Sequence, residues 1–179
     1  EHGRGCLATT NGMAAIWLTL ELFDPGSHII ASEDLYGGSV RLFDAVKESH
    51  DISVSYINTS FPDEVRKAVR ENTKALYIET PSNPMMEVTD LAEMRKIADE
   101  HGLLLIVDNT FLSPYFQNPI DFGADIVVHS GTKYLEGHND TLAGFVISRT
   151  EELHERLAFL YKTMGPCLAP FDSFLVLRG

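Results

Sequence analysis

Cysteines, long apolar runs and basic residues are all scarce in this sequence of 179 residues. The two cysteines are too few for a disulfide framework and favour a reducing, cytoplasmic compartment. Apolar runs such as 103–107 are far too short to span a bilayer, and residues 1–5 hold no apolar signal core, so no membrane partner is expected. Because 14 Lys and Arg stand against 26 Asp and Glu, the net charge of −12 argues against a nucleic-acid partner.

Apolar and amphipathic segments alternate along the chain without repeats or linkers. The segments expected to form strands are 28–32, 53–57, 74–79, 103–107, 125–128 and 142–148. The expected helices cover 12–23, 38–49, 62–71, 89–101, 151–164 and 171–178. This alternation predicts an α/β fold with a mostly parallel sheet. In such sheets ligands bind at the carboxyl ends of the strands, so the residues that follow the strands are the candidates for a site.

Several polar residues stand at these positions. They are Asn83 after 74–79, Asp108 and Thr110 after 103–107, and Ser130, Thr132 and Lys133 after 125–128, with Gly12 and Met13 opening the first helix. Because the carboxyl ends of parallel strands meet at one edge of a sheet, we expect these residues to lie along the same edge.

Lys133 has the most distinctive setting of the lysines. The others lie on charged helices or before a strand, whereas Lys133 follows an apolar strand and a Ser-Gly-Thr turn. A lysine in a desolvated pocket has a lowered pKa and can attack a carbonyl to form a Schiff base. The spacing alone fits a surface lysine in a loop equally well.

Asp108 is either a turn carboxylate or a buried carboxylate that holds a positive charge. Pyridoxal phosphate (PLP) needs the second arrangement, because an aspartate keeps the pyridine nitrogen protonated and the ring can then act as an electron sink. Ser130, Thr132 and the amides at Gly12 and Met13 suit its phosphate, since amides at a helix N-terminus bind anions. An Asn-Gly pair before a helix also fits a plain cap.

Tyr36 and the histidines complete the candidates. Tyr36 precedes Gly37-Gly38, so it either belongs to a simple turn or presents its ring to a planar ligand. His129 and His138 are nine residues apart, and the sequence has neither a His pair at i, i+4 nor a CxxC motif. We therefore expect no metal site and assign these histidines to hydrogen bonding.

Together these residues resemble the Cys/Met-metabolism, PLP-dependent trans-sulfuration enzymes. The matching stretches follow one another in the family's order, and the resemblance covers essentially the whole chain. They are 11–16 (NGMAAI), 35–39 (LYGGS), 78–84 (IETPSNP), 107–111 (VDNTF), 123–134 (GADIVVHSGTKY), 137–140 (GHND) and 170–179 (PFDSFLVLRG). Each motif alone is a weak signal, whereas all of them in the right order are a strong one.

The resemblance implies the large domain of the aspartate aminotransferase-like fold (PLP-dependent transferase fold type I), with a mostly parallel seven-stranded sheet between helices. It also implies two catalytic residues: Lys133 carries PLP as a Schiff base and acts as a base, and Tyr36 stacks on the ring and assists proton transfer. The implied cofactor contacts are Asp108 to the ring nitrogen, Asn83 to the ring hydroxyl, Thr110 beside the ring, and Gly12, Met13, Ser130 and Thr132 to the phosphate.

The activity implied by the resemblance is the making or breaking of C–S bonds in a small amino-acid substrate, by β- or γ-elimination or replacement. The stretches FLSP and QNP and the form YGGS favour a cystathionine γ-synthase-like enzyme, with cystathionine β-lyase and methionine γ-lyase as alternatives. Family members form homotetramers built as dimers of dimers, so a homotetramer is implied for the full-length chain.

The family's sequence continues past both ends of this one. Residues 1–179 are therefore expected to be the PLP-binding large domain of a longer enzyme, truncated at both ends. Within the motifs, Asn11 stands where Ser or Thr is common and Glu136 where Gly is common. A noncatalytic PLP-binding or assembly module is the alternative of another class. A generic nucleotide-binding domain is disfavoured, because the chain lacks both GxGxxG after a first strand and a Walker A loop.

Overall fold

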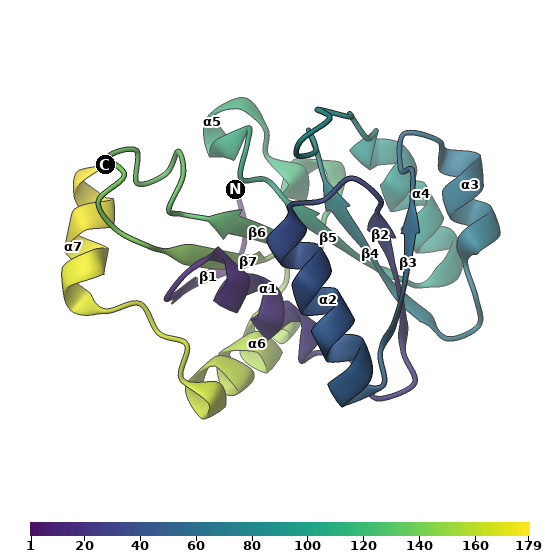
Figure 1. Cartoon of the computed structure of the whole chain (residues 1–179), viewed down its shortest axis with the longest axis horizontal. Helices are drawn as coiled ribbons and strands as arrows, with labels where there is room; N and C mark the ends of the chain where they lie inside the picture. The colour runs from purple at the N-terminus through teal and green to yellow at the C-terminus, as the bar shows by residue number, and fades with distance from the viewer.

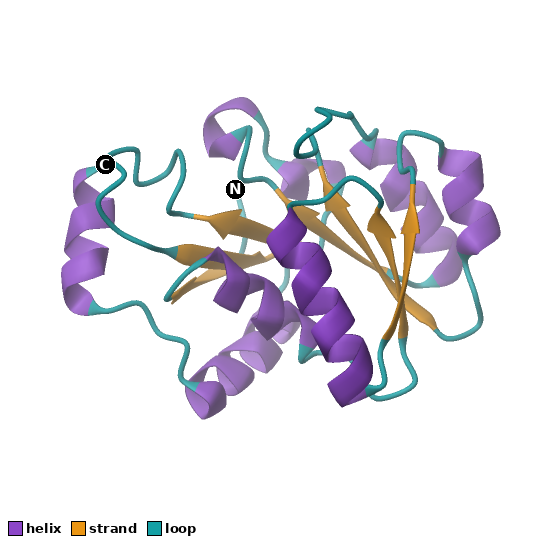
Figure 2. Cartoon of the chain, in the orientation of Figure 1, coloured by secondary structure: helices purple, strands orange, loops and turns teal.

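A single seven-stranded sheet runs through the molecule, with helices on both of its faces (Figures 1 and 2). The computed structural model describes all residues 1–179. The strands are β1 (Gly5–Thr9), β2 (His28–Ser32), β3 (Ser53–Ile57), β4 (Thr73–Glu79), β5 (Leu104–Asp108), β6 (Ile126–Ser130) and β7 (Gly144–Ser148). Their order across the sheet is β1-β7-β6-β5-β4-β2-β3.

The pairing is mixed, with parallel pairs predominating. The pairs β2–β3, β2–β4, β4–β5 and β5–β6 are parallel, whereas β7 runs antiparallel to both β1 and β6. The predicted α/β fold with a mostly parallel sheet is confirmed. The helices are α1 (Gly12–Leu20), α2 (Gly37–His50), α3 (Pro62–Ala68), α4 (Leu91–His101), α5 (Ser113–Phe116), α6 (Glu151–Met164) and α7 (Pro170–Arg178), with a 3-10 turn η1 (Pro119–Phe122).

Several predicted helix boundaries were wrong for local reasons. Helix α1 ends at Leu20 instead of 23, because the chain then tightens into i→i+3 bonds from the Leu22 and Phe23 amides. Helix α3 ends at Ala68 instead of 71, since the next residue turns to an extended conformation. Helix α4 begins at Leu91 instead of 89, because the Asp90 carboxylate caps it by accepting from two backbone amides.

The edge strand β1 was not predicted at all, and β7 begins at Gly144 instead of 142. Strand β1 has the sequence GCLAT, which has little of the β-branched and aromatic character typical of strands. Its conformation is fixed by the antiparallel pairing with β7, a contact between segments far apart in the chain.

Two apolar layers hold the helices against the sheet. Helices α1, α2 and α6 pack on one face, where Leu18, Phe43 and Leu157 are fully buried or nearly so. Helices α3 and α4 pack on the other face through Val65 and Met94. Burial on both faces explains the near-continuous apolar strands. No helix is long and apolar enough to cross a bilayer.

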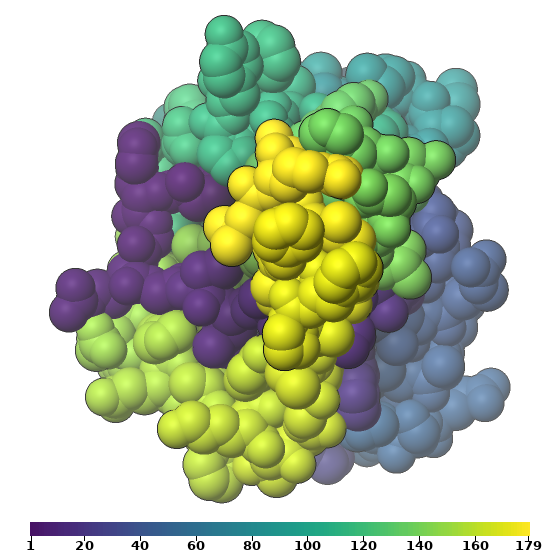
Figure 3. All heavy atoms as spheres, turned by 90° about the vertical axis from the view of Figure 1, so that its left-hand side faces the viewer, coloured from purple at the N-terminus to yellow at the C-terminus, as the bar shows by residue number.

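The topology brings one end of most strands to a single edge. The parallel strands β2, β4, β5 and β6 end there, and so does β1. Helices α1 and α2 begin at the same edge, because they follow β1 and β2. Helix α7 lies apart, as a column on the outer surface in Figure 3, and none of its residues is buried. The Thr141 hydroxyl, which donates to Asp172 at 2.6 Å, ties it to the body.

Candidate functional site

A cavity of about 260 Å³ opens at the edge where the parallel strands end. That volume is close to the lower end of the range for small-molecule sites, roughly 300–1,000 Å³. All nine residues predicted for the cofactor line it: Gly12, Met13, Tyr36, Asn83, Asp108, Thr110, Ser130, Thr132 and Lys133. The other lining residues, to which no cofactor role was assigned from the sequence, are Asn11, Ile16, Glu79, Phe111 and Leu142.

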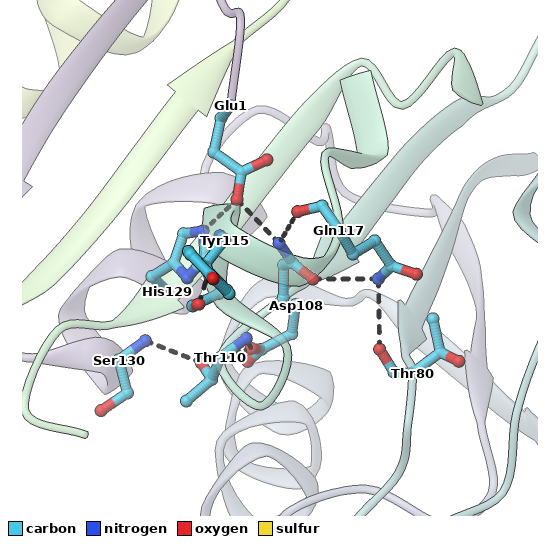
Figure 4. A network of polar contacts seen from close by, with 10 residues as sticks. Glu1, Thr80, Asp108, Thr110, Tyr115, Gln117, His129 and Ser130 are labelled. Carbon is cyan, nitrogen blue, oxygen red and sulfur yellow. Dashed lines mark hydrogen bonds and ion pairs between the residues drawn. The ribbon is translucent and has the colours of Figure 1, made fainter. Parts of the chain in front are cut away.

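Asp108 lies at the floor of this cavity, at the end of β5, and is almost completely buried. Its Oδ1 accepts from the backbone amide of Thr110 at 3.0 Å and from the Thr110 hydroxyl at 2.6 Å. The same hydroxyl accepts from the Ser130 amide at 2.8 Å, so Thr110 links the ends of β5 and β6 (Figure 4). Burial raises the pKa of Asp108, and the hydrogen bonds from Thr110 oppose that rise.

Glu79 provides a second buried carboxyl group in the cavity. It ends β4 directly opposite Asp108 of β5, and its Oε2 accepts from the Tyr36 amide at 3.0 Å. Burial first, and then the charge of Asp108, raises the pKa of Glu79 to about 8. Both residues lie in the matched stretches, but only the register between β4 and β5 shows that they are neighbours.

These two carboxyl groups fit a cationic ligand. Burial and mutual repulsion disfavour their charged forms, and a positive charge placed between them relieves both effects. The protonated ring nitrogen of PLP is such a charge. The pairing predicted for Asp108 is therefore compatible with this environment.

The start of α1 forms the opposite end of the cavity and fits a phosphate. Gly12 and Met13 carry the first two helical amides, which have no carbonyl partner one turn earlier in a helix. A Cβ on Gly12 would lie 2.8 Å from the Ser130 Cβ, so only glycine lets the helix start approach β6 this closely. The cap residue Asn11 accepts from the Ala14 amide at 2.8 Å and leaves the first two amides to the cavity.

Thr132 is less available for a phosphate than the sequence suggested. Its hydroxyl donates to the Ala143 carbonyl at 3.2 Å and accepts from the Ala143 amide at 3.1 Å. A phosphate bond from Thr132 therefore requires the exchange of an existing bond. The Ser130 hydroxyl makes no such bond, which makes it the better donor of the two.

Tyr36 and Asn83 come from two different loops. Tyr36 precedes α2, and its ring lies directly over Gly38, where a Cβ would be 2.3 Å from the ring. The absence of a side chain at Gly38 therefore gives the ring its place beside the cavity. Asn83 lies in the loop after β4 and is half-buried.

Lys133 lies in the turn after β6 and is exposed to solvent, although its side chain lines the cavity. Its backbone amide donates to the Ser130 carbonyl at 3.2 Å, which holds the turn against the strand end. Residues 1–179 therefore do not shield Lys133 from water, in contrast to the desolvated pocket considered from the sequence.

A buried polar network supports the Asp108 turn from the other face of the sheet (Figure 4). The Glu1 carboxylate lies 2.6 Å from His129 Nε2 and accepts from the Asn109 amide group at 2.7 Å. The Gln117 amide group donates to Asn109 Oδ1 at 2.9 Å and to the Thr80 carbonyl at 3.4 Å. The network joins the ends of β4, β5 and β6, and it gives His129 a hydrogen-bonding role.

The other histidine of the candidate set, His138, bonds locally. Its Nδ1 lies 2.9 Å from the Glu136 carbonyl, and its amide donates to the buried Glu136 carboxylate at 3.0 Å. The structure holds no group of three or more His, Cys, Asp or Glu side chains placed to bind a metal ion.

Comparisons with known proteins agree with this geometry. A family model described as "Cys/Met metabolism PLP-dependent enzyme" matches residues 1–179. The chain is 48% identical over 179 residues to cystathionine gamma-lyase of Bacillus subtilis (strain 168), and 46% identical over 180 residues to cystathionine gamma-synthase of Haemophilus influenzae. These alignments cover 100% of this chain but 47% and 49% of the two relatives, so the chain spans about half their length.

A solved structure shows the same fold. The crystal structure of cystathionine gamma-lyase from Lactobacillus plantarum complexed with L-serine superposes with a TM-score of 0.97 at 44% identity. The match covers 99% of this chain and 46% of that one. The fold is thus that of the PLP-dependent fold type I enzymes, as the resemblance implied. The chain belongs to the Cys/Met-metabolism PLP-dependent enzyme family.

Proposed function

We propose that this chain is the cofactor-binding part of a PLP-dependent trans-sulfuration enzyme that makes or breaks C–S bonds in sulfur amino acids. A cystathionine γ-synthase-like reaction is our first choice, with cystathionine β-lyase or methionine γ-lyase chemistry as the alternative. The relatives that match over the whole chain include a γ-lyase, a γ-synthase and β-lyases. We also propose a cytoplasmic homotetramer for the whole protein.

One observation carries the proposal. The cavity places an amine, a buried carboxyl group and free helix amides together, in Lys133, Asp108 and Gly12-Met13. PLP has a group for each of them: an aldehyde, a ring nitrogen and a phosphate.

When bound, PLP supplies an aldehyde that condenses with amines and a protonated ring that withdraws electrons from the reacting carbon. Lys133 Nζ is the amine that holds the cofactor, and the same atom is the base that takes up the substrate's α-proton. Asp108 keeps the proton on the ring nitrogen. Tyr36 covers the ring, and its phenol assists proton transfer.

The module alternative shares the cofactor pocket but predicts no turnover. An arginine outside residues 1–179 that binds the substrate carboxylate would distinguish the enzyme from the module. Activity of the whole protein toward cystathionine or an O-acylhomoserine would distinguish them as well. Activity of the whole protein toward either substrate rejects the module.

The first test is covalent mapping. The whole protein is incubated with PLP, reduced with borohydride and digested, and the adduct is located by peptide mass spectrometry. We expect the adduct on Lys133 and no turnover in Lys133→Ala. Lys74→Ala, at an exposed lysine of β4, is the matched control and should retain both adduct and activity. An adduct elsewhere, or wild-type turnover without Lys133, would reject the assignment.

A further inference from the structure

Two loops each carry a residue that lines the cavity. The loop from β2 to α2 ends at Tyr36, and the loop from β4 to α4 contains Asn83. Two carboxyl groups bond in opposite directions between these parts of the chain: Asp34 of the β2–α2 loop to the β4–α4 loop, and Glu79 at the end of β4 to Tyr36. We propose that Asp34 and Glu79, the carboxylate clamp, are positioning residues that fix the separation of Tyr36 and Asn83 around the cofactor ring. This inference rests on the proposed function.

Asp34 makes the first half of the clamp. Its Oδ2 accepts from the Met85 amide at 2.8 Å and from the Ser82 hydroxyl. Ser82 is buried, and its Oγ also accepts from the Glu87 amide at 2.8 Å. One carboxylate oxygen of the β2–α2 loop therefore binds the residues on both sides of Asn83.

Glu79 makes the second half. Its Oε2 accepts from the Tyr36 amide at 3.0 Å, and Tyr36 is the N-cap residue of α2. No side chain of α2 caps this helix start. In a capping box, a glutamate inside the helix reaches back to the N-cap amide. Here the acceptor comes from β4, so the position of Tyr36 is set by the strand that leads to Asn83.

The other bonds of the β4–α4 loop do not reach the β2–α2 loop. Ser82 pairs with Glu87 inside the loop, Glu87, Val88 and Thr89 bind the segment after β3, and Thr80 binds Gln117. These bonds hold the turn in the body of the molecule but do not tie it directly to Tyr36. Without Asp34 the turn keeps its shape while its distance from the β2–α2 loop becomes variable, which would move Asn83 away from its ring contact.

Amide hydrogen exchange in the cofactor-free whole protein tests the contacts directly. In Asp34→Ala we expect exchange at Met85 to rise about 10- to 100-fold, the range for loss of a hydrogen bond to a charged group. Asp34→Asn keeps an oxygen acceptor and should stay within a few-fold of the wild type. Asp90→Ala is the matched control, because Asp90 also accepts from two backbone amides but both belong to the first turn of α4; it should change exchange at Ala92 and Glu93 and leave Met85 unchanged.

PLP titration of the same variants tests positioning. We expect Asp34→Ala to weaken the apparent Kd for PLP about tenfold and to shift the visible absorption of the Lys133 adduct, and Asp34→Asn to restore both. If Asp34→Ala does not fold, Ser82→Ala keeps the bond from Met85 to Asp34 but removes both bonds of the Ser82 hydroxyl, the one to Asp34 and the one from the Glu87 amide. It should produce smaller changes at Met85 in the same direction. Glu79→Gln should keep the protection of the Tyr36 amide, because its carbonyl oxygen can still accept.

The outcomes separate the two proposals. Unchanged exchange at Met85 in Asp34→Ala overturns the clamp, and so does faster exchange with wild-type PLP affinity and spectrum. Faster exchange together with weaker PLP binding supports it. If the wild type forms no adduct on Lys133, the proposed function fails, while the exchange experiment still decides whether Asp34 holds the loops together.

Discussion

His28 shows how a single residue sets a pH limit on stability. It starts β2 and is completely buried, with Nδ1 2.8 Å from the Thr73 hydroxyl and Nε2 2.9 Å from the Ser55 hydroxyl. Burial first, and then the positive charge of Arg70, lowers the pKa of His28 from 6.5 to about 4. The folded state therefore holds the neutral imidazole over a range in which the unfolded chain is protonated.

The sign of the pH effect follows from this lowered pKa. Stability from His28 is fully present above pH 6.5 and is lost as the pH falls toward about 4. The loss amounts to about 3 kcal/mol, at about 1.4 kcal/mol per pKa unit. We expect His28→Gln to unfold more easily at neutral pH but with a flatter dependence, measured by urea unfolding between pH 7 and pH 4. The exposed His101→Gln is the control, and a wild-type slope in His28→Gln would contradict the assignment.

At the scale of elements, the start of α1 depends on how closely it can approach β6. Its first residue, Gly12, lies against Ser130, and both line the phosphate end of the cavity. Helix start and strand end are therefore in direct contact, and a side chain at residue 12 would push them apart at the phosphate end of the cavity.

Gly12→Ala tests this contact. The added Cβ would meet Ser130 Cβ at 2.8 Å and Ser130 Cα at 3.0 Å, so the helix start or the strand end must shift. We expect a stability loss of about 1–3 kcal/mol and weaker PLP binding, about tenfold for each 1.4 kcal/mol of phosphate binding lost. Gly37→Ala, at the first residue of α2, is the control because its Cβ would meet only Arg41 Nη1 at 3.9 Å. Equal effects of the two substitutions would show that the close contact at Gly12 is not the cause.

At the scale of the whole molecule, Asp125 joins three parts of the fold on the edge opposite the cavity. It is buried, and its Oδ2 accepts from Arg95 of α4 at 2.8 Å and from the Leu105 amide of β5 at 2.9 Å. Its Oδ1 accepts from Arg149, just after β7, at 2.6 Å. Without this carboxylate the Arg95 side chain, which is only 15% exposed, would keep a single ionic partner, Asp99, which is 70% exposed.

We expect Asp125→Ala to lower the free energy of unfolding by about 3 kcal/mol, the lower end of the range for breaking a buried ion pair, because Arg95 loses its buried counter-charge and keeps only the exposed Asp99. Urea unfolding followed by circular dichroism measures this change. Asp63→Ala is the control, since that carboxylate pairs with Arg66 at a site that is 88% exposed, and its unfolding midpoint should stay unchanged. A similar midpoint for both variants would mean that Asp125 does not join these elements energetically.

Local features account for the parts of the molecule that the sequence predicted well. The alternation of apolar strands with amphipathic helices is a local pattern, and it led to the correct fold class. The residues after the strands could be placed at one edge because parallel strands all point the same way. That rule led to eight of the nine cofactor candidates, whereas Tyr36 was proposed from its position before Gly37-Gly38, and the structure brings all nine into one cavity. Their individual roles remain predictions.

What the sequence by itself determined is the alternation of six of the seven strands with the longer helices, and the residues that follow each of those strands, because both depend on neighbouring residues. Only the tertiary structure decided the place of β1, the pairing of Glu79 with Asp108, the engagement of the Thr132 hydroxyl and the exposure of Lys133. Each of these depends on register or contact between segments far apart in the chain. Such contacts form when the sheet is assembled, so no local pattern encodes them.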